Sequence, residues 1–164
     1  FAAFAVDGYA SAGNILSGKF LGAKEFETLV QLSQKLTKKA LIVGISMASI
    51  GGIFYNSLGE VFTSDPIVLS IFNEVFWIVL LMQPLCALTF VFDGIFKGLG
   101  QMRVLRNVLL TSTLLVFIPA LFLGDSLNLK LHGILWAFTI WIVARGLPLF
   151  VKFRKQFLPL TRKH

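Results

Sequence analysis

Four long stretches of this sequence contain no charged residue, and their length decides what the chain can fold into. They are residues 40–58, 75–92, 108–123 and 133–144. With one flanking ion each, the first two and the last extend to about 20 residues, the length of helix that crosses a bilayer core of about 30 Å. Lipid offers the backbone no hydrogen bonds, so such segments are helices or closed-barrel strands, and uninterrupted apolar runs favour helices. The sequence therefore predicts an all-α membrane protein.

The composition of the chain excludes several other classes of protein. Of its 164 residues, 56% are hydrophobic and 14% are charged, whereas a soluble domain is about 25% charged. The net charge of +7 comes from basic residues between the apolar stretches, so we expect membrane lipid and no nucleic acid as a partner. The single cysteine, Cys86, excludes a disulfide framework or a cysteine metal site. No catalytic, metal or cofactor motif is present, so we predict that the protein is not an enzyme.

The apolar stretches and the segments between them define the predicted organisation of the chain. Five membrane spans are expected, at about residues 1–21, 40–58, 67–96, 104–123 and 131–151. Residues 23–39, which are charged with interspersed apolar positions, predict an amphipathic interfacial helix, and residues 152–164 predict a basic cytoplasmic tail. Asp65 and Pro66 predict an N-cap and a first helical residue before the third span. Because the chain starts without a methionine or a signal peptide, we expect a fragment of a longer protein.

The distribution of basic residues tests this layout, because cytoplasmic loops carry an excess of Lys and Arg. The first connection has five, the third has three and the tail has five, whereas the second has none and the fourth has one. Thirteen of the fifteen basic residues thus fall on one side of the predicted membrane, and Arg145 lies inside a span. We predict a multi-pass protein of the bacterial inner membrane with its C-terminus in the cytoplasm.

Asp7, Asp93 and Arg145 lie inside the predicted spans, where a charge costs about 2.5–3.5 kcal/mol and usually faces the protein interior or a water-filled cavity. At about 1.5 Å per residue, Asp93 and Arg145 lie roughly 6 and 10 Å from the nearest flanking lysine. We therefore predict an ion pair between them with a structural or gating role. Asp7 lies roughly 18 Å from Lys19, near the midplane, and has no basic residue at its depth.

Two roles remain open for Asp7. An unpaired carboxylate near the midplane is suited to exchanging protons or cations, but a hydrogen bond to a neighbouring helix explains it equally well. Ser11 and Asn14 follow Asp7 by one and two helical turns, so the three residues predict a polar stripe on one helix face. Such a stripe lines a substrate or ion cavity or serves helix packing.

Three separated segments resemble one transporter family. The segment from Ala5-Val-Asp7-Gly8 to Gly22-Ala23 resembles the eighth helix of multidrug and toxic compound extrusion (MATE) transporters of the DinF branch. Phe92-Asp93-Gly94-Ile-Phe-Lys-Gly98, followed by Met102-Arg103 and Arg106-Asn107, resembles the tenth helix and its loop. Ala144-Arg145-Gly146-Leu147 resembles the twelfth.

The resemblance implies that the chain forms most of one six-helix lobe of a twelve-helix transporter. Its partner would be the N-terminal lobe of the same protein, which this sequence does not contain. It implies efflux of small organic or drug-like compounds by alternating access, coupled to H⁺ or Na⁺. Two positions that are acidic in some family members are not acidic here: Asn14, and the region of Cys86, where the sodium-coupled branch carries an acid. The coupling aspartate proposed for the DinF branch is in the first helix of the transporter, outside this chain. The alternatives are a lipid-linked precursor flippase of the same superfamily, which would favour several Arg or Lys in its cavity, and a membrane scaffold subunit without transport.

Overall fold

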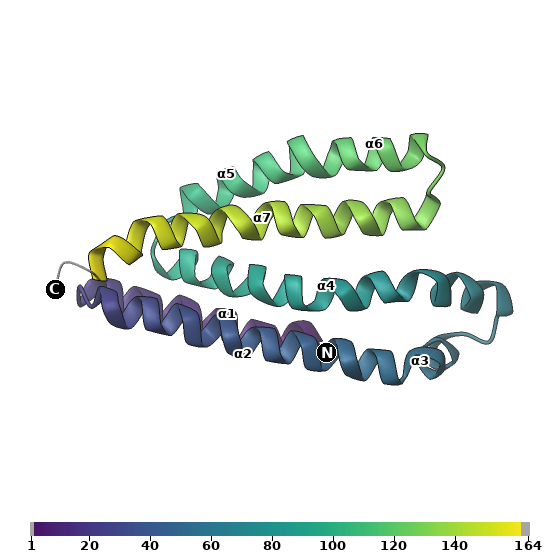
Figure 1. The fold of residues 1–164 in the computed structure, drawn as a ribbon, viewed down its shortest axis with the longest axis horizontal. Helices are drawn as coiled ribbons and strands as arrows, with labels where there is room; N and C mark the ends of the chain where they lie inside the picture. The colour runs from purple at the N-terminus through teal and green to yellow at the C-terminus, as the bar shows by residue number, and fades with distance from the viewer. Residues whose placement is uncertain (1, 162–164) are drawn as a thin grey trace.

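The apolar stretches form long helices that run back and forth along one axis of the computed structural model (Figure 1). The structure describes residues 2–161, and within that range no strand occurs. The elements are α1 (Ala2–Gly22), α2 (Phe26–Ile53), α3 (Tyr55–Phe62), α4 (Pro66–Gly98), α5 (Met102–Ser112), a π-helical segment η1 (Thr113–Phe117), α6 (Ile118–Ser126) and α7 (Lys130–Thr161). The prediction of an all-α membrane fold is confirmed.

Four helical stretches among the described residues are long and apolar enough to cross a membrane. They are residues 26–53, 66–98, 102–126 and 130–160. The first predicted span corresponds to α1, whose 21 residues reach about 31 Å but which is not among these four. Polar and small residues along α1 distinguish it from the other helices, so its place as a fifth span stays a prediction.

Helices continue across two predicted boundaries, where we expected separate segments. Residues 26–39 of the predicted interfacial segment are the first half of α2, and residues 152–161 of the predicted cytoplasmic tail are the end of α7. The interfacial and cytoplasmic locations stay predictions. Phe26 lies against Phe157 with ring centroids 6.3 Å apart, which joins the two extensions. At 28 and 32 residues, α2 and α7 are about 42 and 48 Å long, well beyond a bilayer core.

Local signals explain where several helices begin and end. Asp65 caps α4 by accepting a hydrogen bond from the backbone N–H of Ile67 at 2.8 Å, and Pro66 is the first helical residue, as predicted. The turn after α4 places Gly100 at φ +68°, with hydrogen bonds from Gly100 to Lys97 and from Gln101 to Phe96. This pattern is a Schellman motif, which ends the helix and satisfies its last carbonyls.

The two ends of the bundle differ in charge. The α1–α2 turn, the α4–α5 turn and the end of α7 lie together at one end, whereas the α3–α4 and α6–α7 connections lie at the other (Figure 1). We call the first the basic end, because the helix termini there carry most of the lysines and arginines. Gln101 Nε2 donates to Gln156 Oε1 at 3.0 Å and ties two of these segments together.

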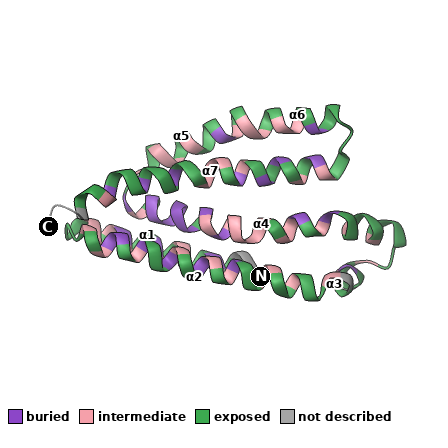
Figure 2. Ribbon diagram, viewed as in Figure 1, coloured by how far each residue is buried: buried purple, intermediate pink, exposed green. Residues whose placement is uncertain are grey.

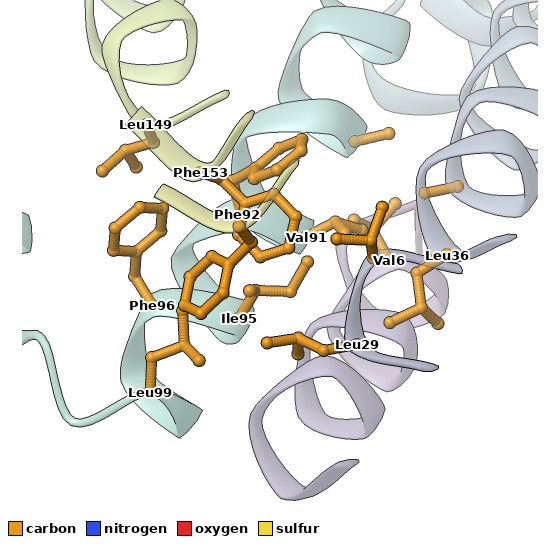
Figure 3. Close-up of a cluster of buried hydrophobic side chains, with 14 residues drawn as sticks. Val6, Leu29, Leu36, Val91, Phe92, Ile95, Phe96, Leu99, Leu149 and Phe153 are labelled. Carbon is orange, nitrogen blue, oxygen red and sulfur yellow. The ribbon is translucent and has the colours of Figure 1, made fainter. Parts of the chain in front are cut away.

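The hydrophobic core is concentrated near the basic end. Most buried positions of α4 lie in the half that leads to the α4–α5 turn (Figure 2). Around it, apolar side chains from four helices form one cluster (Figure 3). Its members include Val6, Leu29, Leu36, Val91, Phe92, Ile95, Phe96, Leu99, Leu149 and Phe153. Exposed apolar residues, by contrast, occur along most of the bundle, as expected of a surface that meets lipid and further helices.

Candidate functional site

The second half of α4 carries the buried ionic contact of the bundle. Asp93 is 3% exposed, and its Oδ2 accepts a hydrogen bond from Arg145 Nη2 on α7. Its Oδ1 is also buried but has no hydrogen-bond partner among the described residues. Only one oxygen of this carboxylate is therefore paired, although a buried charge is stable only when it is paired and hydrogen-bonded.

Arg145 extends this contact to an aromatic side chain on its own helix. Its guanidinium lies 5.5 Å from the centre of the Trp141 ring, one helical turn earlier, an arrangement that permits a cation–π interaction. Trp141 Nε1 in turn donates to Thr113 Oγ1 at 3.1 Å. Thr113 is the first residue of η1, so a continuous set of contacts joins α4, α7 and the π-helical segment.

Pro119 lies just after the π-helical segment and provides a local explanation for it. Pro119 has no N–H, so it cannot donate to the carbonyl of Leu115, four residues earlier and inside η1. Loss of that bond disturbs the regular α-helical pattern, and short π segments occur frequently at functional sites. Phe117 packs on Phe138 and Trp141, with centroids 5.0 and 6.0 Å apart, which holds η1 against α7.

Gly94 and Gly98 place α4 directly against α1. A Cβ at Gly94 would collide with the backbone carbonyl of Ala10, and one at Gly98 would collide with that of Asn14. Glycines four residues apart let two helix backbones approach in this way. The four-residue spacing of Gly94 and Gly98 is visible in the sequence. Glycine alone does not predict such a contact, since a Cβ at Gly8 or Gly22 of α1 would meet open space.

These contacts correct the predicted depths. Because Gly94 lies at Ala10 and Gly98 at Asn14, α1 and α4 run parallel with a constant offset in residue number. Asp7 is thus level with Val91, only about 3 Å along the axis from Asp93. The predicted difference of about 12 Å between the two aspartates is wrong, because it assumed that Lys19 and Lys97 mark the same plane.

The predicted polar stripe lies on the surface of α1. Asp7, Ser11 and Asn14 are all exposed on one face, whereas Val6 and Ser17 point toward the neighbouring helices and are buried. None of the three stripe side chains has a hydrogen bond or ion pair within residues 2–161. The structure therefore groups Asp7, Ser11 and Asn14 together, and it places Asp93 and Arg145 at a second, buried location.

Two features of the site lay outside our sequence interpretation. Trp141 is four residues before Arg145, so an aromatic–arginine contact on one helix face could have been recognised from spacing alone. The hydrogen bond to Thr113 could not, because it joins two helices. Among the described residues, no three His, Cys, Asp or Glu side chains gather into a group that could hold a metal ion.

The fold and these contacts define a class of protein: a multi-pass helical membrane bundle with an ion pair buried between two of its helices. Comparison with known families identifies it further. The MatE family model matches residues 1–123, and the chain belongs to that family. The resemblance to MATE transporters is confirmed at the family level, and the DinF branch stays a prediction.

Individual relatives agree with this assignment. The chain is 31% identical over 95 residues to Protein DETOXIFICATION 45, chloroplastic, of Arabidopsis thaliana, covering 58% of this chain and 17% of the relative. It is 28% identical over 143 residues to Protein DETOXIFICATION 42 of the same plant, covering 85% and 27%. It is 27% identical over 157 residues to Probable multidrug resistance protein YoeA of Bacillus subtilis, covering 93% and 34%. The matched region thus spans about a third or less of these relatives.

Proposed function

We propose that this chain is the C-terminal lobe of a DinF-like MATE exporter, which moves small organic compounds by alternating access in exchange for H⁺ or Na⁺. Membership of the MatE family and the names of the relatives, which speak of detoxification and multidrug resistance, support this proposal. The observation that carries it furthest is the polar stripe of Asp7, Ser11 and Asn14, exposed on an otherwise apolar membrane bundle. In lipid such a face is costly, so it belongs against a water-filled cavity or another part of the protein.

In this proposal the two intramembrane carboxylates have different roles. Asp7 is a cavity group that binds a coupling cation or a cationic part of the substrate, with Ser11 and Asn14 offering further oxygen and amide groups. Asp93 and Arg145 hold α4 against α7 and connect that contact to η1 through Trp141. We further propose that the basic end faces the cytoplasm.

The exporter is favoured over a flippase by the charge of the stripe. A cavity for a lipid-linked phosphate would be lined by several cations, but between Asp7 and Asn14 the α1 helix carries no basic residue. A scaffold subunit is a different outcome, and it predicts that neutralising Asp7 alters abundance without altering transport per molecule.

Transport by the full-length protein tests the proposal. We expect proteoliposomes to accumulate ethidium in response to an imposed pH or Na⁺ gradient, and the Asp7→Asn variant to lose most of this accumulation at normal abundance. Asp125→Asn, which neutralises an exposed carboxylate at the end of α6, is the matched control and should transport normally. Gradient-driven accumulation that is unchanged in Asp7→Asn would remove Asp7 from the coupling role, and its absence in the unaltered protein would contradict the exporter.

A further inference from the structure

A groove between α2 and α7, with α4 as its floor, has not been assigned a role. It consists of two adjoining cavities of about 280 and 370 Å³. Thr37, Phe92 and Phe150 line both of them, so the cavities are next to each other. The rings of Phe92 and Phe150 meet edge to face at 5.4 Å where the cavities join.

The two cavities differ in the polar and cationic residues that line the smaller one. The larger one is almost wholly apolar, and its lining includes Leu41, Leu85, Leu88, Val143 and Leu147. The smaller one, toward the basic end, combines apolar side chains, among them Val30 and Phe153, with five polar or charged ones. These are Ser33, Gln34, Thr37, Lys38 and Arg154. No acidic residue lines either cavity, so the charge of Lys38 and Arg154 is not neutralised within the groove.

Arg154 packs on an aromatic ring that lines both cavities. Its guanidinium lies 5.5 Å from the centre of the Phe150 ring, one turn back along α7 toward the junction of the cavities. Lys38 of α2 and Arg154 of α7 line the smaller cavity from different helices. A single anionic group placed there would meet a cation on each side, with the hydroxyl of Thr37 and the amide of Gln34 nearby.

We propose that the groove binds an anionic phospholipid from the leaflet that meets the basic end. The phosphate lies between Lys38 and Arg154, and one acyl chain lies in the apolar cavity formed by Leu85, Val143, Leu147 and their neighbours. A lipid fits because Val143 and Leu147 are exposed on a membrane-spanning helix, where acyl chains are the surrounding medium. Basic pockets between transmembrane helices recognise lipid headgroups by the same charge complementarity. This inference depends on membrane insertion and not on the proposed transport.

Photocrosslinking in nanodiscs tests the proposal in the full-length protein. Phosphatidylglycerol and phosphatidylcholine, each with a diazirine in the acyl chain, are compared, and adducts are mapped by mass spectrometry. We expect phosphatidylglycerol to label residues 85–92 and 143–150 several-fold more than phosphatidylcholine does. Lys38→Gln/Arg154→Gln should abolish this preference, whereas Lys38→Arg/Arg154→Lys, which keeps both charges, should retain it.

A matched control separates the groove from the general charge of the basic end. Lys35→Gln/Lys155→Gln removes the same charge from the same two helices, at exposed positions that line neither cavity, and should leave the preference intact. Leu147→Trp, which fills the apolar cavity, should lower labelling by both lipids. Equal losses in the control and the test variant would overturn the proposal. A lack of adducts in the groove would do so as well, since it would mean that another part of the full-length protein covers it.

Discussion

Asp93 and Gly94 are neighbours in the chain but contact different helices. Successive helical residues point about 100° apart, so Asp93 reaches Arg145 on α7 while Gly94 lies against the backbone of α1. The other Asp-Gly pair of the sequence, Asp7 and Gly8, has neither contact: Asp7 is exposed, and a Cβ at Gly8 would meet open space. The same two residue types therefore serve packing in α4 and remain on the surface of α1.

The buried ion pair predicts a non-additive response to mutation. Asp93→Asn leaves the guanidinium of Arg145 without its counter-ion, and Arg145→Gln leaves the Asp93 carboxylate buried and unpaired. Breaking a buried pair from one side costs about 3–5 kcal/mol, whereas neutralising both sides costs much less. We expect each single variant to lower the apparent Tm of the full-length protein and its detergent-stable fraction, and the double variant to recover most of the loss. If the double variant is as unstable as the two losses added together, the residues are not coupled.

At the scale of the elements, α4 is the centre of the bundle because it contacts α1, α2 and α7 along separate faces. Small residues make two of these contacts possible. Gly44 of α2 lies where a Cβ would come within 2.8 Å of the Cα of Pro84, so α2 packs closely at the proline of α4. Gly94 and Gly98 do the same for α1. Helix association here depends on backbone approach, as is common for helices in lipid.

A series of glycine-to-alanine substitutions tests this interpretation of the α1–α4 contact. Gly94→Ala and Gly98→Ala should each destabilise the protein, by about 1–3 kcal/mol, because the new methyl group collides with a backbone that has no rotamer to change. Gly8→Ala and Gly22→Ala are the controls, with nothing within 4 Å of the added Cβ, and should be neutral or stabilising by up to about 1 kcal/mol through helix propensity. Thermal unfolding measures the difference, and equal effects at all four positions would contradict the close packing.

A separate prediction concerns the π-helical segment η1, which lies between α5 and α6. Pro119→Ala restores an N–H that can reach the carbonyl of Leu115, so residues 113–117 should become regular α-helix. We expect slower amide hydrogen exchange in these residues. Pro148→Ala, in the α7 helix away from η1, is the control for a general gain in helix stability. Unchanged exchange in residues 113–119 of Pro119→Ala would show that the π segment has another cause.

At the scale of the molecule, the sequence predicted the helical stretches and their order far better than their ends and their register. Charge-free runs mark the spans directly, but Phe153 and Phe157 extend α7 because they pack on other helices, and only their four-residue spacing from Leu149 signals this. The predicted depths of the two aspartates were wrong for a similar reason. A flanking lysine shows roughly where a helix leaves lipid, whereas the relative height of Asp7 and Asp93 depends on how Gly94 and Gly98 fit against α1. That fit is a contact between distant segments, which no local pattern contains.

The orientation of the whole bundle leads to the last prediction. The turns and termini of the basic end should lie in the cytoplasm, because Lys and Arg are retained on that side during insertion. The test uses a cysteine-free full-length variant, which carries Cys86→Ser and has any other native cysteine replaced. Single cysteines are then introduced at two exposed positions. Gln156→Cys lies at the basic end, and Asn128→Cys lies in the α6–α7 connection at the opposite end. A membrane-impermeant maleimide applied to intact cells should label Asn128→Cys, whereas Gln156→Cys should be labelled only after the membrane is made permeable. The reverse labelling pattern would show that the basic end faces away from the cytoplasm. Labelling of both positions in intact cells would contradict a bundle that spans the membrane.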